Sequence, residues 1–139
     1  MDNPPPAATS GLTPYLTIKG AGGEAAIAFY RQAFGAEVRH LVPAQDGKRI
    51  MHAHLLINGC SMMISDDFPE FHEGGRPAAD PGGFTLHLSV DDADGWWKRA
   101  VDAGAQVTMP LDDQFWGDRY GQLKDPFGFS WSISAPVKK

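Results

Sequence analysis

Alternating and helical patterns of apolar residues predict a β-α-β-β-β order in the first half of the chain. Residues 14–19 alternate between apolar and polar positions, which is typical of a half-buried strand. Apolar residues then recur at helical spacing over 23–34, and Gly35 suits a left-handed helix cap. Three further strands are predicted over 37–43, 49–57 and 60–65. Asn58-Gly59 joins the last two, because this dipeptide favours a tight hairpin.

The second half of the chain repeats this order. Residues 84–90 alternate again, and Asp91 and Asp92 can cap a helix that ends at Gly104. Three strands are predicted over 106–108, 117–124 and 129–134, separated by Pro110 and by the turn 125–128. The pattern therefore predicts an α+β fold made of two paired β-α-β-β-β modules.

These elements suggest a simple domain organisation. Residues 1–11 hold three consecutive prolines and no apolar periodicity, so we expect a flexible tail. We expect a single domain over 12–136, with modules at 12–66 and 83–136 and a linker at 67–82. The segment between the modules is rich in Pro, Gly and acidic residues. We interpret it as a connection, and a lid is the alternative.

One face of the predicted sheets is polar without being charged. It carries Tyr15, Thr17, His52, His54, Thr85, His87, Ser89, Ser130, Ser132 and Ser134. The opposite face is apolar, includes Met51, and suits the two helix stripes. Solvated sheet faces usually carry Lys, Glu and Arg, whereas these side chains suit a partly buried, hydrogen-bonding wall. We expect a twisted sheet to curl this face into a small-molecule pocket, with a dimer interface or a wetted face as the alternative.

Composition narrows the class of protein. The 139 residues carry 12 Lys and Arg against 17 Asp and Glu, a net charge of -5, and no basic cluster, which argues against nucleic-acid binding. One cysteine, Cys60, excludes an internal disulfide and suits a reducing compartment. No run approaches the length of a membrane span, and the first residues lack signal-peptide features. We therefore expect a soluble, cytoplasmic protein with no membrane partner.

Several runs resemble a known family. They are Leu12-Thr13-Pro14-Tyr15-Leu16, Ala26-Ile27-Ala28-Phe29-Tyr30, Ala33-Phe34-Gly35-Ala36-Glu37, His52-Ala53, Gln114-Phe115-Trp116-Gly117-Asp118-Arg119 and Asp125-Pro126-Phe127-Gly128 with Trp131. Over residues 12–135 the chain resembles the PhnB-like branch of the vicinal-oxygen-chelate superfamily, which includes glyoxalase I, extradiol dioxygenases, and bleomycin- and fosfomycin-resistance proteins. The resemblance implies paired modules that form a cup, usually in a homodimer.

The resemblance also bears on metal binding. Metal-binding members place His and Glu ligands on the first, third, fifth and last strands of the modules, and here those positions hold Tyr15, His54, Thr85 and Ser132. Only His54 is a good ligand, because hydroxyls lack the donor strength that zinc, nickel or iron sites use. We therefore expect no cofactor. The alternative is a zinc-like divalent ion held by His52, His54 and His87, if these imidazoles converge.

Each candidate site residue has a chemical role. His54 and His87 are the candidate catalytic residues, since a neutral imidazole can act as a general base. The candidate substrate-binding residues are Tyr15, His52, Thr85, Trp116, Arg119 and Ser132. Trp116 offers an aromatic plane and Arg119 a bidentate cation. Alternatively, Trp116 packs at a loop edge and Arg119 pairs with a carboxylate such as Asp118 or Asp125.

Three functions remain open on the sequence. The first is a small-molecule-binding protein of the glyoxalase/bleomycin-resistance type without the usual metal site, which predicts affinity without turnover. The second is a lyase, isomerase or dioxygenase in which a metal or a histidine activates a small oxygenated substrate. The third is an accessory protein that acts through its dimer surface, which predicts an empty or closed cup. The departures at Tyr15, Thr85 and Ser132 favour the first.

Overall fold

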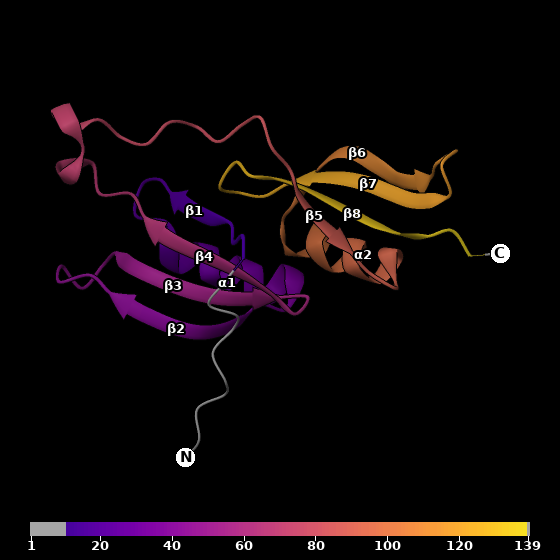
Figure 1. The fold of residues 1–139 in the computed structure, drawn as a ribbon, viewed down its shortest axis with the longest axis horizontal. Coiled ribbons are helices and arrows are strands. Elements are labelled where there is room, and N and C mark those ends of the chain that lie inside the picture. The colour runs from indigo at the N-terminus through magenta and orange to yellow at the C-terminus, as the bar shows by residue number, and fades with distance from the viewer. Residues whose placement is uncertain (1–10, 139) are drawn as a thin grey trace, which may run out of the picture. The chain divides into compact units, whose positions relative to one another are not determined.

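The computed structural model, which describes residues 11–138, contains two β-α-β-β-β modules joined by a long connection (Figure 1). The first module consists of β1 (Tyr15–Ile18), α1 (Gly23–Phe34), β2 (Glu37–Pro43), β3 (Ile50–Ile57) and β4 (Cys60–Asp66). The second consists of β5 (Leu86–Ser89), α2 (Ala93–Ala103), β6 (Gln106–Asp113), β7 (Asp118–Lys124) and β8 (Ser130–Pro136). The predicted fold class is confirmed. The tail predicted over 1–11 lies outside the described residues except for its last position.

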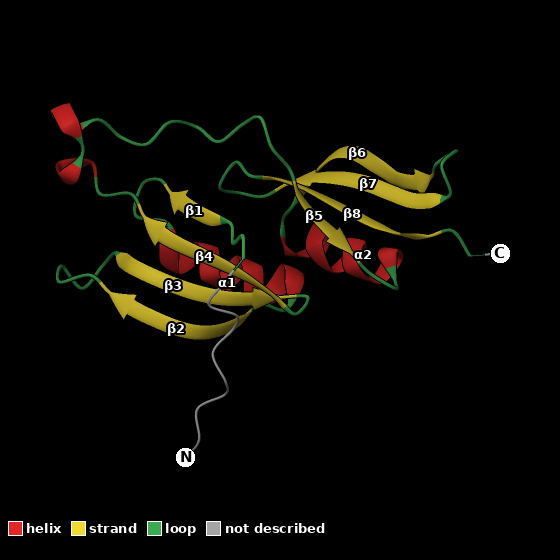
Figure 2. Cartoon of the chain, viewed as in Figure 1, coloured by secondary structure: helices red, strands yellow, loops and turns green. Residues whose placement is uncertain are grey.

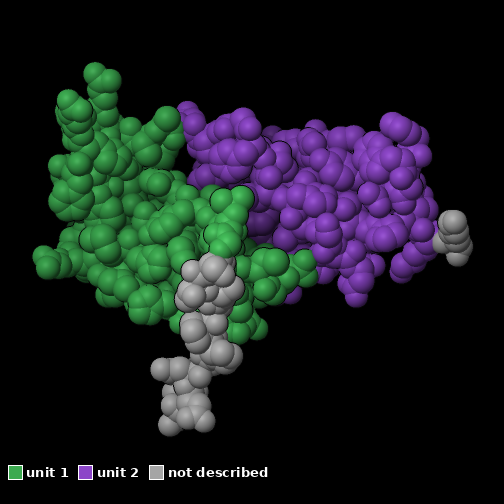
Figure 3. Space-filling model, in the orientation of Figure 1, with its two compact units in different colours: residues 1–31, 35–79 green, residues 32–34, 80–139 purple. Residues whose placement is uncertain are grey.

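Each module has its own four-stranded sheet with the same topology (Figure 2). The strand order is β1-β4-β3-β2 in the first and β5-β8-β7-β6 in the second. β1 is parallel to β4 and β5 is parallel to β8, while the other pairs are antiparallel. The chain divides into two compact units, residues 1–31 with 35–79 and residues 32–34 with 80–139 (Figure 3).

A buried carboxylate ties the first module together. Asp66 at the end of β4 is 1% exposed, and its Oδ1 accepts the Gly23 N–H at 2.7 Å while its Oδ2 accepts the Ile50 N–H at 2.6 Å. The carboxylate therefore joins the start of α1 to the start of β3. A Cβ on residue 23 would lie 2.6 Å from Asp66 Oδ2, so the sequence needs glycine there.

Two further aspartates stabilise local structure in the second module by accepting N–H groups. Asp92 caps α2 by accepting the Gly95 N–H at 3.1 Å. Asp125 is 5% exposed and accepts the N–H groups of Phe127 and Phe129 at 2.8 and 3.0 Å and the Trp131 Nε1–H at 2.9 Å. The turn predicted over 125–128 is thus held by its own aspartate, which also anchors β8.

The observed strand pairing differs from the prediction in the side on which Met51 lies and in the length of the strand that begins at residue 106. Met51 was expected on the helix-facing side but is 42% exposed, because Val42 pairs with His52 and Pro43 with Ile50, which leaves Met51 as the extra residue of a β-bulge. The predicted strand at 106–108 continues through Pro110 to residue 113, since β6 is an edge strand and an edge tolerates proline.

The connection between the modules contains two short 3-10 helices, η1 (Pro69–Phe71) and η2 (Glu73–Gly75). Asp67, which begins this connection, is 5% exposed, and its Oδ2 accepts the Ala78 N–H at 2.7 Å. The first part of the connection is therefore tied back on itself by a buried carboxylate.

Candidate functional site

The first module presents a row of polar side chains on the sheet face opposite its buried core, here called the open face. The register aligns Tyr15 of β1 with Met63 of β4, Met63 with His54 of β3, and His54 with His40 of β2. His52 lies two residues before His54 on the same strand and the same side. The open face therefore combines one tyrosine with three histidines.

Tyr15 and His52 form a hydrogen-bonded pair on this face. The Tyr15 hydroxyl lies 2.7 Å from Nδ1 of His52, and the two ring centroids are 5.6 Å apart. Burial lowers the pKa of His52, and the neighbouring His40 and His54 lower it further. A neutral imidazole that accepts the tyrosine proton on Nδ1 carries its own proton on Nε2, so the pair presents an N–H donor to a ligand.

His54, predicted as catalytic, is half-buried, and its Nε2 lies 2.9 Å from Ser61 Oγ across the β3–β4 pair. His40 was missed by the sequence analysis, although its ring centroid is 6.0 Å from that of His52. A bulge at Arg39 separates the pairs Val38–Leu55 and His40–His54, so simple alternation along β2 does not place His40. The short connection between β2 and β3 favours a hairpin, and this hairpin is the sequence signal that could have placed His40 beside a residue of β3.

A groove of about 620 Å³ lies beside the open face, within the first compact unit, between the first module and the start of the connection. It is lined by Val42, Pro43, Ala44, Gln45, Asp46, Arg49, Met51, Phe68, Glu70 and Phe71. Val42 pairs with His52, and Met51 precedes it, so the groove adjoins the Tyr15–His52 pair. Its size falls in the range of small-molecule sites.

Arg49 organises the groove. Its Nε donates to Asp46 Oδ2 at 2.6 Å, and its Nη1 and Nη2 donate to the two Glu70 oxygens at 3.0 and 2.6 Å. Its Cζ lies 4.3 Å from the centroid of the Phe68 ring. The side chain thereby fixes η1 against the β2–β3 turn.

The groove keeps its charges across the physiological range. Backbone N–H groups of Arg49 and Lys48, followed by the Arg49 side chain, hold the pKa of Asp46 well below its usual value. The Arg49 hydrogen bond also lowers the pKa of Glu70. The same two carboxylates raise the pKa of Arg49. Two negative charges and one positive charge therefore line this groove.

In the second module His87 is fully hydrogen-bonded within its own sheet. Its Nδ1 lies 2.6 Å from Ser132 Oγ and its Nε2 lies 3.0 Å from Ser134 Oγ. Its ring stacks on Tyr120 at 6.0 Å between centroids. Ser132 is only 1% exposed. His87 and Ser132, two predicted site residues, are thus brought together, with both ring nitrogens engaged.

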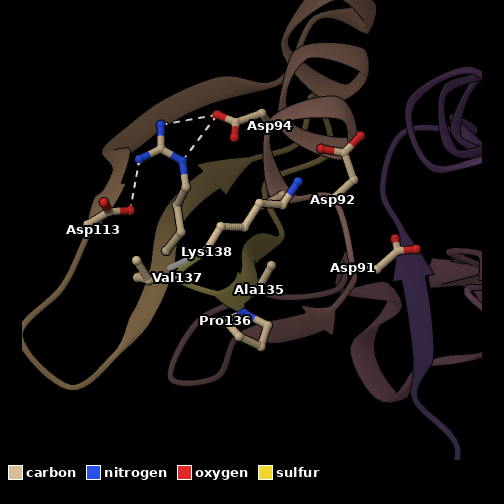
Figure 4. A pocket seen from close by; sticks show the side chains of 10 residues that line it. Asp91, Asp92, Asp94, Asp113, Ala135, Pro136, Val137 and Lys138 are labelled. Carbon is tan, nitrogen blue, oxygen red and sulfur yellow. Dashed lines mark hydrogen bonds and ion pairs between the residues drawn. The ribbon is translucent and has the colours of Figure 1, made fainter.

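Arg119 and Trp116 occupy different surroundings. The Arg119 guanidinium donates to Asp94 and Asp113 at 3.1 Å each, beside a pocket of about 240 Å³ (Figure 4). The alternative that Arg119 pairs with a carboxylate is therefore correct in kind, although the partners are not Asp118 or Asp125. Trp116 is 50% exposed and packs edge-on against Tyr120 at 5.8 Å.

Thr85 does not lie on a strand. β5 begins at Leu86, so the strand predicted from residue 84 starts two residues late and Thr85 is an exposed loop residue. The strand starts later than predicted because the first β5 residue paired with β8 is Leu86, which lies opposite Trp131. The role of Thr85 in substrate binding stays a prediction.

The residues at the family's metal positions do not make a strong donor set. Tyr15 is bonded to His52, Ser132 is buried against His87, Thr85 lies off the strand, and only His54 is a good ligand. Among residues 11–138, no group of three or more His, Cys, Asp or Glu is placed to hold a metal ion. By donor chemistry, three of these four side chains are poor ligands for zinc, nickel or iron, and the expectation that no metal binds stays a prediction.

The chain belongs to the Glyoxalase/Bleomycin resistance protein/Dioxygenase superfamily, whose family model matches residues 16–133. The uncharacterized protein Mb0911c of Mycobacterium bovis is 44% identical over 131 residues, covering 92% of this chain and 84% of that protein. Protein PA1353 from Pseudomonas aeruginosa matches with a TM-score of 0.74 and 26% identity over 94% of this chain and 100% of that one. A PhnB protein from Bacillus cereus shares the fold, with a TM-score of 0.66 and 19% identity over 91% and 99% of the two chains.

Within the part of the chain that the structure describes, no helix has the length and apolar character needed to cross a membrane.

Proposed function

We propose that the protein binds a small organic molecule on the open face of its first module, without a resident divalent metal. The observation that carries this proposal is the Tyr15–His52 pair at 2.7 Å, next to a groove of about 620 Å³. Pockets of this kind combine apolar walls with a few convergent polar groups that orient the ligand. The superfamily, named for enzymes and for a drug-resistance protein, is consistent with a small-molecule ligand.

The geometry suggests how a ligand would be held. His52 Nε2–H is a donor toward the ligand when Nδ1 accepts from Tyr15, and the Tyr15 oxygen keeps acceptor capacity. His54 Nε2 is engaged by Ser61 Oγ, so Nδ1 is the ring nitrogen that we expect a ligand to meet. Apolar atoms would then enter the groove beside Met51. The arrangement recognises a molecule with polar groups at one end and an apolar body at the other.

A histidine-dependent enzyme is the second candidate, and the same pair favours it. A neutral His52 with a lowered pKa can accept a proton from a bound substrate, with Tyr15 orienting the ring. His54 and His87 remain the catalytic candidates that the sequence suggested. Such an enzyme would turn over a small oxygenated substrate with a rate that falls as His52 becomes protonated.

We also propose that the protein is a cytoplasmic homodimer. Its single cysteine is exposed and unpaired in the described chain, which suits a reducing compartment. The dimer rests on the family resemblance. Light scattering on the purified protein tests the dimer, and a monomeric mass over the accessible concentration range contradicts it.

Binding is tested on protein dialysed against EDTA, with a panel of fragment-sized aromatic acids, amines and neutral heterocycles, followed by imidazole and methyl NMR signals. We expect saturable shifts at His52, His54 and Met51. Tyr15→Phe should weaken binding, whereas the matched Tyr120→Phe change in the second module should not. Absence of saturable shifts on the open face across the panel, or binding that needs restored zinc, contradicts the proposal. Catalytic turnover by the EDTA-treated protein would favour the enzyme instead.

A further inference from the structure

We propose that the groove selects a planar aromatic cation, such as a protonated amino-heterocycle. This inference rests on the proposed function, because it names the ligand class of the same site. Three features carry it: an exposed aromatic surface, a planar cation that already occupies one side of the groove, and a surplus of negative charge.

The aromatic surface belongs to η1 and the residue before it. The Phe68 and Phe71 rings stack with centroids 5.7 Å apart and an interplanar angle of 24°. Phe71 is 74% exposed. Val42 and Met51 also line the groove and contribute apolar atoms from β2 and β3. A flat ring system bound in the groove would stack on Phe71 and cover exposed hydrocarbon.

Arg49 shows the interaction that the groove supports. Its guanidinium is a planar cation, lies 4.3 Å from the Phe68 ring centroid, and is hydrogen-bonded at its edge by Asp46 and Glu70. Stacking on a ring face together with edge contacts to carboxylates is the geometry that a planar organic cation requires. The second stacked ring, Phe71, offers the equivalent position to a ligand.

The charge balance sets the sign of the ligand. Asp46, Glu70 and Arg49 are the charged side chains that line the groove among the described residues, so it carries one net negative charge. The carboxylates stay ionised because their pKa values are lowered. Asp46 Oδ1 already accepts the N–H groups of Lys48 and Arg49, whereas Asp46 Oδ2 and the two Glu70 oxygens each accept one bond from the Arg49 guanidinium and keep acceptor capacity for a ligand N–H. An anionic ligand would be repelled by the same two groups.

The test compares three ligands of one shape: 9-aminoacridine, acridine and acridine-9-carboxylate, which are cationic, neutral and anionic at neutral pH. Their affinities are measured by fluorescence titration at low and high salt. We expect 9-aminoacridine to bind about tenfold more tightly than acridine, with a preference that shrinks as salt rises. Acridine-9-carboxylate should bind most weakly.

Matched variants localise the effect. Phe71→Ala should weaken 9-aminoacridine binding about tenfold, while Phe115→Ala, which removes a ring that is 96% exposed in the second module, should not. Glu70→Gln should weaken it about fivefold, while Glu73→Gln, just outside the groove, should not. Shifts of the Met51 methyl signal on titration of the wild-type protein provide a readout that depends on no variant.

The outcomes separate the two proposals. Equal or tighter binding of acridine or its carboxylate, or variant effects no larger than those of the controls, overturns the cation class. If the neutral or anionic ring still binds at the open face and responds to Tyr15→Phe, the proposed function stands without this inference. If no acridine perturbs the Met51 signal, the groove proposal is overturned, whereas the function is judged by its own fragment panel.

Discussion

Replacement of Asp66 should destabilise the first module more than replacement of any exposed aspartate. Asp66 is almost fully buried and accepts two backbone N–H groups, from Gly23 and Ile50. Asp66→Ala leaves both N–H groups buried without that partner, and each unsatisfied donor costs about 1–3 kcal/mol. We expect the free energy of unfolding to fall by about 4 kcal/mol. Asp66→Asn keeps one acceptor but faces the other N–H with its amide group, so we expect a loss of about 2 kcal/mol.

The assay must observe the first module. Trp96, Trp97, Trp116 and Trp131 all lie in the second unit. Urea unfolding should therefore be followed by circular dichroism as well as by tryptophan fluorescence. With a slope of about 2 kcal/mol per molar urea, Asp66→Ala should lower the midpoint by about 2 M. The exposed Asp91→Asn is the control. A loss below about 1 kcal/mol for Asp66→Ala, or a wild-type midpoint for Asp66→Asn, would refute the reasoning.

Four further results are expected. Gly121→Ala should lower stability by about 1–3 kcal/mol and alter tryptophan fluorescence, because its Cβ would lie 2.6 Å from the Trp97 ring, whereas Gly82→Ala meets nothing within 4 Å and should be neutral. His40→Ala should raise the pKa of His52 in NMR titrations, because a like charge is removed; an unchanged or lower value would count against the assigned cause. The folded state disfavours protonated His52, so the pKa of His52 is lower in the folded than in the unfolded chain. The stability that neutral His52 contributes is therefore present above pH about 6.5 and is lost as the pH falls through the folded pKa. His52→Gln should make the free energy of unfolding depend less on pH in this range. Dialysis against EDTA should leave the thermal midpoint unchanged, and a fall that zinc restores would contradict the metal-free proposal.

Local signals made the fold predictable. Gly35 and Gly104 end the two helices in left-handed conformations, and Asn58 and Gly59 form the hairpin between β3 and β4 with positive φ values. These features depend on a few neighbouring residues, so one sequence suffices to find them. The helix predicted over 23–34 is confirmed at both ends.

Long-range pairing limited the prediction of the site. The place of His40 depends on which β3 residue faces it, and a bulge at Arg39 decides that register. The groove depends on Arg49 reaching Glu70, 21 positions away, which no periodicity encodes. Tyr15 and His52 were assigned to one polar face from alternation alone, yet their direct hydrogen bond reflects the parallel β1–β4 pairing. The joint arrangement of His52, His54 and His87 stays a prediction.

The bulge at Met51 shifts the alternation of side chains between the two faces of β3. Because one residue is left out of the ladder, Ile50 turns into the core while Met51 and His52 share the open side. Arg49, one position before Ile50, consequently falls on the side of the histidines. If Met51 were instead paired within the ladder, strict alternation would place Met51 in the core, and Ile50 and Arg49 would each move to the opposite side. The two carboxylates that meet Arg49 would then lose their shared cation, and the hollow beside the sheet would lose the side chain around which it is built.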